Sequence, residues 1–140
     1  MRIGTESIPA EYSKVKTNFG YVFYKFFNEK RDKESAKNRC ALDSYLLHLP
    51  IPRNQEENDF FQNISQIFGS NFWLGINDEK NEGNFVGDDG SKIEWFNWYN
   101  GQPDNFEIQN NVRMLNGFWR DVNQDMELSF ICSYIERSGL

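Results

Sequence analysis

Apolar residues between positions 54 and 69 recur at the spacing of an α-helix. They are Phe60, Phe61, Ile64, Ile67 and Phe68. Asn54 stands before them as a favourable helix cap, with Glu57 three residues later, and Gly69 interrupts the pattern. The sequence therefore predicts a helix that begins after Asn54 and ends near residue 68.

The chain before this helix predicts a strand, another helix and an extended connection. Residues 21–27 form a dense aromatic run that is typical of a strand. Residues 29–42 are expected to be helical, and the lysines between 30 and 39 are interleaved with acidic residues, which indicates a solvated helix face. Two prolines argue against a helix between residues 47 and 53.

Short apolar runs later in the chain predict the remaining strands. They cover residues 73–76, 112–115, 118–119 and 129–134. Asn116-Gly117 predicts a tight hairpin turn, whereas glycine, asparagine and aspartate dominate residues 77–111 and predict long loops. We expect an α+β fold in which two helices flank small antiparallel sheets with a long-loop region. The expected boundaries are a flexible segment at 1–17, one domain at 18–136 and a tail at 137–140.

Composition argues against several functional classes. The 140 residues carry a net charge of −6, and the basic residues are scattered, so nucleic acid is not an expected partner. No apolar run approaches the ~20 residues of a membrane helix, and the first six residues lack the apolar stretch of a signal peptide. The single histidine, His48, lies beside leucines and is interpreted as partly buried. No nucleophile motif, phosphate loop or His/Cys metal spacing is present, so we do not expect an enzyme.

Several motifs in a particular order carry a family resemblance. Trp73-Leu74-Gly75-Ile76 is followed by the aromatic and polar segment 95–106, then by Trp119-Arg120-Asp121-Val122, and finally by Phe130-Ile131-Cys132. In this order the motifs resemble a C-type lectin domain, over residues 21 to 132. The resemblance implies the α+β fold of that family in its short form and a carbohydrate-binding function.

The resemblance also implies a disulfide between Cys40 and Cys132, and with it a secreted or extracellular setting. On composition alone, two buried free thiols in a cytosolic protein are the alternative. The family's second disulfide is missing, because its positions correspond to Asn111 and Gln124. A hydrogen bond between these amides can replace it, with a net contribution of about 1 kcal/mol.

In C-type lectins the peptide that corresponds to Gln102-Pro103 is cis, so that the side chains flanking the proline share one calcium ion. Gln102 and Asp104 are those side chains here, and calcium prefers oxygen ligands of both kinds. In the family, Gln-Pro-Asp in this order goes with galactose-type sugars. Phe106 supports the same preference, since an aromatic ring can pack against the apolar face of galactose. The expected partners are therefore galactose-type glycans or glycoproteins.

The other calcium ligands depart from the family pattern. Asp121 is kept, but Arg120 stands in place of an asparagine and Gln109 in place of a glutamate. A guanidinium cannot bind a cation, so Arg120 turns away, displaces the metal, or contacts a sugar such as an acidic one. Glu107 is expected to supply a third carboxylate. The expected carbohydrate-binding residues are Gln102, Asp104, Phe106 and Asp121, with Arg120 as a weaker candidate.

A second calcium ion is a weaker expectation from the resemblance. Asp78 and Glu82 match the auxiliary ligands of the family, whereas Asn105 and Asn110 replace acids that usually complete that site; Gln109 stays a weaker candidate ligand of the first calcium ion. Fewer carboxylates weaken a site for a hard cation.

Two functions follow from these observations. The first is a secreted, calcium-dependent lectin with a preference for galactose-type sugars. The alternative is a calcium-independent domain of the same fold that recognises a protein ligand through its long loops, with an Arg120–Asp104 ion pair in place of the metal. A homo-oligomer would raise the avidity of a weak, shallow sugar site. Asn63-Ile64-Ser65 is a candidate glycosylation site if Asn63 faces outward.

Overall fold

The computed structural model describes residues 4–104 and 109–137 and has the predicted α+β class. In order, the elements are β1 (Ser13–Thr17), β2 (Gly20–Arg31), α1 (Lys33–Asp43), α2 (Gln55–Ser65), β3 (Asn71–Asn77), β4 (Val86–Gly87), β5 (Asn111–Leu115), β6 (Phe118–Val122) and β7 (Leu128–Arg137). Short 3-10 helices at Thr5–Ser7 and Gln66–Phe68 complete the described elements. The strand order is β1-β2-β7-β3-β5-β6, and β4 pairs with β3.

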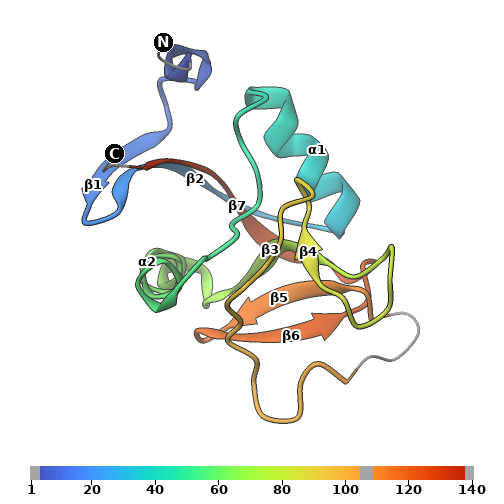
Figure 1. Cartoon of the computed structure of the whole chain (residues 1–140). Coiled ribbons are helices and arrows are strands. Elements are labelled where there is room, and N and C mark those ends of the chain that lie inside the picture. Colours follow the sequence, from blue (N-terminus) through green and yellow to red (C-terminus); the bar gives the residue numbers. More distant parts are fainter. Residues whose placement is uncertain (1–3, 105–108, 138–140) are drawn as a thin grey trace.

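The sheet is mixed rather than purely antiparallel. Within the described part, β3 and β7 run parallel, whereas the other paired strands are antiparallel. In Figure 1, α1 and α2 lie on opposite sides of the central strands β7 and β3. Side chains of a strand point alternately to its two faces. Trp73 of β3 accordingly joins the apolar cluster on the α1 side, and its neighbour Phe72 joins the cluster on the α2 side.

The two helices differ in how closely they match their predictions. The Asn54 side chain accepts a hydrogen bond from the Glu57 amide (2.9 Å) and caps α2, and a 3-10 turn continues this helix to Phe68. The first helix begins at Lys33 rather than at residue 29. The reason is that β2 continues to Arg31, which pairs with Leu128 of β7, so residues 29–31 belong to the sheet.

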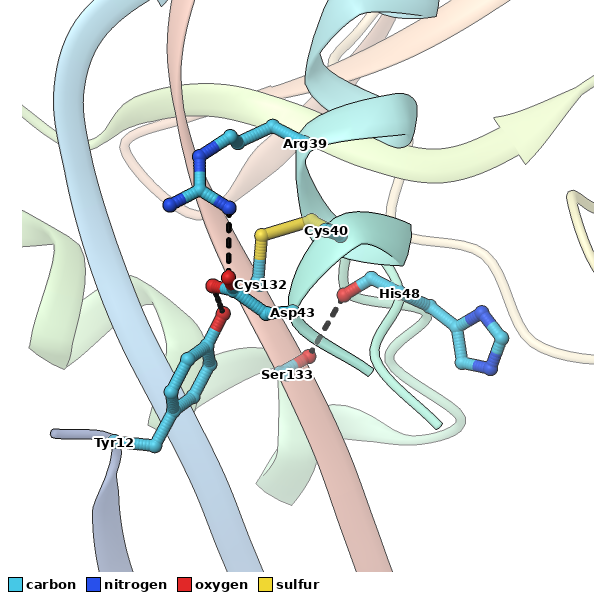
Figure 2. Close-up of a disulfide and its surroundings, with 7 residues drawn as sticks. All are labelled: Tyr12, Arg39, Cys40, Asp43, His48, Cys132 and Ser133. Atoms are coloured by element: carbon cyan, nitrogen blue, oxygen red, sulfur yellow. Dashed lines mark hydrogen bonds and ion pairs between the residues drawn. A yellow bond between two sulfur atoms is a disulfide. The ribbon is translucent and has the colours of Figure 1, made fainter. Parts of the chain in front are cut away.

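The structure contains the disulfide that the resemblance implies, between Cys40 of α1 and Cys132 of β7 (Figure 2). Both cysteines are fully buried. Next to them, the Asp43 carboxylate accepts hydrogen bonds from Arg39 (2.8 Å) and from the Tyr12 hydroxyl (2.7 Å). This corner therefore joins the first helix, the last strand and the N-terminal segment.

The N-terminal segment differs from the flexible stretch expected at residues 1–17. β1 pairs with β2 along its whole length, and Ile8 and Tyr12 are buried in the cluster on the α1 side. Two apolar side chains and an antiparallel pairing hold this segment on the domain, so the domain begins well before residue 18. At the other end β7 reaches Arg137, and the remainder of the expected tail lies outside the described residues.

Candidate functional site

Aromatic packing fixes the loop that carries the candidate ligands beside the edge strand β6. The Trp119 amide donates to the Asn97 carbonyl, and the Tyr99 amide donates to the Trp119 carbonyl, each at 2.9 Å. Trp119 is fully buried, its ring packs edge-on against Trp98, and its indole N–H donates to Asn58 of α2 (2.7 Å). Segment 97–99 is therefore held along β6, and the chain after it emerges at the sheet edge.

The next residues turn back toward β6. Gly101 has a φ of 85°, a left-handed conformation that glycine adopts without steric cost. The Gln102 amide donates to the Tyr99 carbonyl (2.8 Å), and the Gln102-Pro103 peptide is cis, as the resemblance implies. These contacts place the Gln102 side chain and residue 104 next to the C-terminal half of β6.

Three oxygen-bearing side chains, those of Gln102, Asp104 and Asp121, come together at this point. The Asp121 amide donates to Gln102 Oε1 (3.3 Å), and the Asp104 amide donates to Asp121 Oδ1 (3.0 Å). Gln102 Nε2 lies 3.5 Å from Asp104 Oδ2, at the long limit for a hydrogen bond. Asp121 is only 2% exposed, whereas Asp104 faces solvent. The site is a shallow polar surface with one buried carboxylate at its base.

The donor set suits a hard cation, because it consists of two carboxylates and an amide oxygen. Calcium takes about six to eight oxygen ligands, so these side chains would supply part of the shell. Glu107, Phe106 and Asn105 lie outside the described residues. Across residues 4–104 and 109–137, no three acidic, histidine or cysteine side chains form a metal-binding group. A complete calcium site here therefore needs a further ligand, for which Glu107 stays a prediction.

Arg120 points away from the carboxylates. Its guanidinium carbon lies 4.2 Å from the centre of the Tyr99 ring, a cation–π arrangement. Arg120 and Asp121 are consecutive in β6, so their side chains leave opposite faces of the strand. The Arg120–Asp104 ion pair of the alternative function is not among the ion pairs of the described residues.

A second group of side-chain oxygens lies in the loops next to the C-terminal end of β3. Asp78 is 1% exposed, and its Oδ2 accepts from the Gly83 amide (2.7 Å). Its amide donates to the Asn110 carbonyl (3.0 Å), which brings the two loops together. Among the described residues no hydrogen-bond donor reaches Asp78 Oδ1 or Gln109 Oε1, although both atoms are buried. Glu82 is exposed on the same loop.

Lys33 links the two positions of the missing second disulfide. Its amide donates to the Gln124 carbonyl (3.0 Å), and its Nζ donates to Asn111 Oδ1 (2.6 Å) and lies 3.4 Å from Asp88 Oδ1. The side-chain amide nitrogen of Asn111, Nδ2, donates to the Glu79 carboxylate (2.9 Å). Lys33 is 2% exposed, so its interpretation as part of a solvated helix face was wrong. The expected bond between the Asn111 and Gln124 side chains is replaced by this lysine bridge.

Lys33→Met should lower the free energy of unfolding by about 1–3 kcal/mol, because buried acceptors on Asn111 and Asp88 lose their donor. Urea unfolding of the variant and the wild type measures the difference. Lys37→Met, on the same helix but only half-buried, is the matched control and should change stability little. An equal effect of both substitutions would contradict the bridging role of Lys33.

The same variant should alter the pH dependence of stability. Burial lowers the pKa of Lys33 below its ordinary value of 10.5, and the nearby Asp88 carboxylate only partly offsets this effect. Between the lowered pKa of the folded state and 10.5, Lys33 is protonated to a greater extent in the unfolded chain than in the folded protein. Its contribution to the free energy of unfolding therefore rises with pH in this interval. The stability difference between wild type and Lys33→Met should therefore widen as the pH approaches 10.5.

Two further candidates are placed by the structure. The His48 side chain is exposed rather than partly buried, and only its backbone pairs with Ser133 of β7 (2.9 and 2.8 Å). Asn63 is exposed on α2, which meets the geometric condition for glycosylation. No helix in the described part of the chain is long and apolar enough to cross a membrane.

Comparison with known proteins identifies the class. The family profile described as "Lectin C-type domain" matches residues 29–134, and the chain belongs to this family. Its members include carbohydrate-binding lectins, and proteins of this family are non-enzymatic, typically extracellular and typically calcium-binding.

Individual relatives are similar at moderate identity. The α-N-acetylgalactosamine-specific lectin of Patiria pectinifera is 27% identical over 120 residues, which cover 78% of this chain and 71% of that protein. The human versican core protein is 30% identical over 114 residues, 78% of this chain but only 3% of versican.

Solved structures agree with the fold. The carbohydrate-recognition domain of the mouse scavenger receptor C-type lectin is 28% identical, with a TM-score of 0.76 and coverage of 94% of this chain and 98% of that domain. The C-type lectin CEL-I from Cucumaria echinata is 25% identical, with a TM-score of 0.77 and coverage of 89% and 95%.

Proposed function

We propose that this domain binds galactose-type sugars through a calcium ion held by Gln102, Asp104 and Asp121, with Glu107 as a further ligand. The observation that carries the proposal is the convergence of the three described oxygen donors around the cis peptide, with Arg120 stacked away from them on Tyr99. Calcium supplies a Lewis-acidic centre to which two neighbouring sugar hydroxyls can bind.

The protein's own groups would set the sugar preference. Gln102 precedes the proline and Asp104 follows it, the order that goes with galactose-type sugars in the family. The amide can donate a hydrogen bond to the sugar and the carboxylate can only accept, so exchanging the two reverses the pattern of donors and acceptors. Phe106 would pack against the apolar face of the sugar. The N-acetylgalactosamine-specific relative from Patiria pectinifera is consistent with this preference.

A second calcium ion at Asp78 is a further part of the proposal. Its support is the buried Asp78 Oδ1, to which no donor in the described part is bonded, together with the backbone hydrogen bond that joins Asp78 to the loop of Asn110. Glu82 and Asn105 are the additional candidate ligands. We place the protein outside the cell, with glycans or glycoproteins as partners, and propose that self-association raises its avidity.

The test is a calorimetric titration with calcium, followed by galactose and by mannose, each with calcium and with chelator. We expect calcium to bind at about 0.1–1 mM and galactose to bind in preference to mannose, only when calcium is present. Absence of both calcium and sugar binding would reject the proposal and favour the calcium-independent protein-binding alternative. Sugar binding that survives the chelator would reject the metal part alone.

A further inference from the structure

Two arginines face each other on the edge of the sheet. Arg113 of β5 and Arg120 of β6 are directly opposite in the antiparallel register, so their side chains leave the same face. Like charges at such a pair are destabilising. Burial, followed by the charge of Arg120, lowers the pKa of Arg113, which indicates that Arg120 raises the cost of the charge on Arg113.

No carboxylate offsets these charges within the described part of the chain. Its ion pairs include neither Arg113 nor Arg120. Arg113 donates from one terminal nitrogen to Asn71 Oδ1 (3.1 Å), and its buried Nε has no acceptor among the described residues. The Arg120 guanidinium stacks on the Tyr99 ring, and a stacked guanidinium can still donate hydrogen bonds from the N–H groups in its plane. Within the described part of this acidic chain, whose net charge is −6, the two arginines thus form a pair of cations without a carboxylate partner.

This pair adjoins the proposed sugar site. Arg120 and Asp121 are consecutive in the edge strand β6 and leave its opposite faces, so a ligand that contacts both residues would pass across this edge. The Tyr99 carbonyl accepts the hydrogen bond of the Gln102 amide and the Tyr99 ring stacks on Arg120, so this residue connects the two groups. Tyr99 and Phe118 are exposed and their rings are in contact, with centroids 6.2 Å apart. A ligand that extends beyond the primary sugar along β6 would meet apolar rings first and guanidinium groups beside them.

We propose that Arg120 and Arg113, with Tyr99, form a subsite for the anionic group of an acidic galactose-type glycan. A guanidinium presents paired N–H donors that match the oxygens of a sulfate ester or a carboxylate. The bound anion neutralises the arginine pair, and the exposed rings pack against the adjoining sugar. This inference rests on the proposed function for the primary sugar, and it adds the class of glycan that the domain selects.

The test compares lactose with two acidic forms, one carrying a sulfate ester on the primary hydroxyl of its galactose and one carrying sialic acid there. Both leave the galactose ring hydroxyls free. In the presence of calcium, calorimetry should give about tenfold tighter binding of an acidic form, since one charge-assisted hydrogen bond suffices for that factor. The preference should shrink as salt is added. Comparing the two acidic forms identifies sulfate or carboxylate as the anion.

Arg120→Gln and Arg113→Gln should reduce the acidic-to-neutral affinity ratio to about two. Lys16→Gln is the matched control, since it removes one positive charge from β1, at the opposite edge of the sheet, and should leave the ratio near ten. Arg120 is the less constrained of the two, so its variant tests the subsite even if Arg113→Gln fails to fold.

The outcomes separate the two proposals. Equal affinity for lactose and both acidic forms would overturn the subsite and leave the primary sugar site standing. A preference for acidic forms that Lys16→Gln abolishes as strongly as Arg120→Gln would also overturn it, because net charge alone would then explain the effect. Binding of acidic forms that needs Arg120 but neither calcium nor galactose would support the anion site and reject the proposed primary function.

Discussion

Loss of the Cys40–Cys132 disulfide should lower the free energy of unfolding by about 4–5 kcal/mol. The two cysteines are 92 residues apart, so the bond closes most of the chain into one loop and restricts the unfolded ensemble. For a domain of this size the loss should lower the melting temperature by more than about 10 °C. Thermal unfolding monitored by circular dichroism, with and without a thiol reductant, measures it.

A Cys40→Ala/Cys132→Ala variant separates the bond from the packing around it. Both sulfur atoms are buried beside Trp73 and Phe130, so the alanines remove apolar contacts as well as the cross-link. Reduction of the wild type breaks the disulfide but leaves both cysteine side chains in the core, so these apolar contacts remain. We therefore expect the double alanine variant to be less stable than the reduced wild type. If reduction leaves the melting temperature within about 2 °C, the cross-link does not limit stability.

Local signals explain why some of the fold could be predicted. The second helix was predicted well because its cap at Asn54 and its apolar spacing are contained within one segment. The start of the first helix was misplaced because β2 extends to Arg31 through pairing with Leu128, almost a hundred residues away. The N-terminal strand was missed because its pairing with β2 and the burial of Ile8 and Tyr12 in the core hold this segment on the domain. Tertiary pairing overrode local preference at both places.

The candidate site divides in the same way. Gln102, Asp104 and Asp121 could be named from motifs, and the structure brings them together. Lys33 could not, because its partners Asp88 and Asn111 lie 55 and 78 residues away in sequence. In the sequence, Lys33 is one lysine in a run of mixed charges. Such runs are typical of solvated helices, so nothing local indicated that this lysine is buried.

The pairing of Arg113 with Arg120 could be predicted from the sequence even less well than the role of Lys33. Arg120 was recognised as a departure from the family pattern, but its stacking on Tyr99 and its position opposite Arg113 depend on strand register. A one-residue shift in that register would send one of the side chains to the other face. Motif reading could therefore raise the question of Arg120 without deciding between displacement of the metal and contact with a ligand.

Asp121→Asn should weaken calcium binding by about a hundredfold or more and should abolish calcium-dependent galactose binding. Asp121 is the buried carboxylate of the site, and its substitution keeps the shape while removing one negative charge. A unit charge about 2.5 Å from a divalent ion contributes up to about 13 kcal/mol at an effective dielectric of about 20, before the cost of desolvation is subtracted. A hundredfold loss of calcium affinity corresponds to about 3 kcal/mol, which is well below this Coulomb limit.

Calorimetry with calcium, followed by galactose, measures both effects of Asp121→Asn. Asp59→Asn is the matched control, because it removes one exposed carboxylate from α2 and should leave both affinities unchanged. Melting curves in chelator show whether the variant keeps the fold, and Asp104→Asn, at an exposed position of the same site, tests the charge if it does not. Calcium affinity within twofold of the wild type in a folded Asp121→Asn variant would remove Asp121 from the ligand set. The arginine subsite does not depend on this carboxylate for its charge, so acidic glycans would then become the first ligands to examine in chelator.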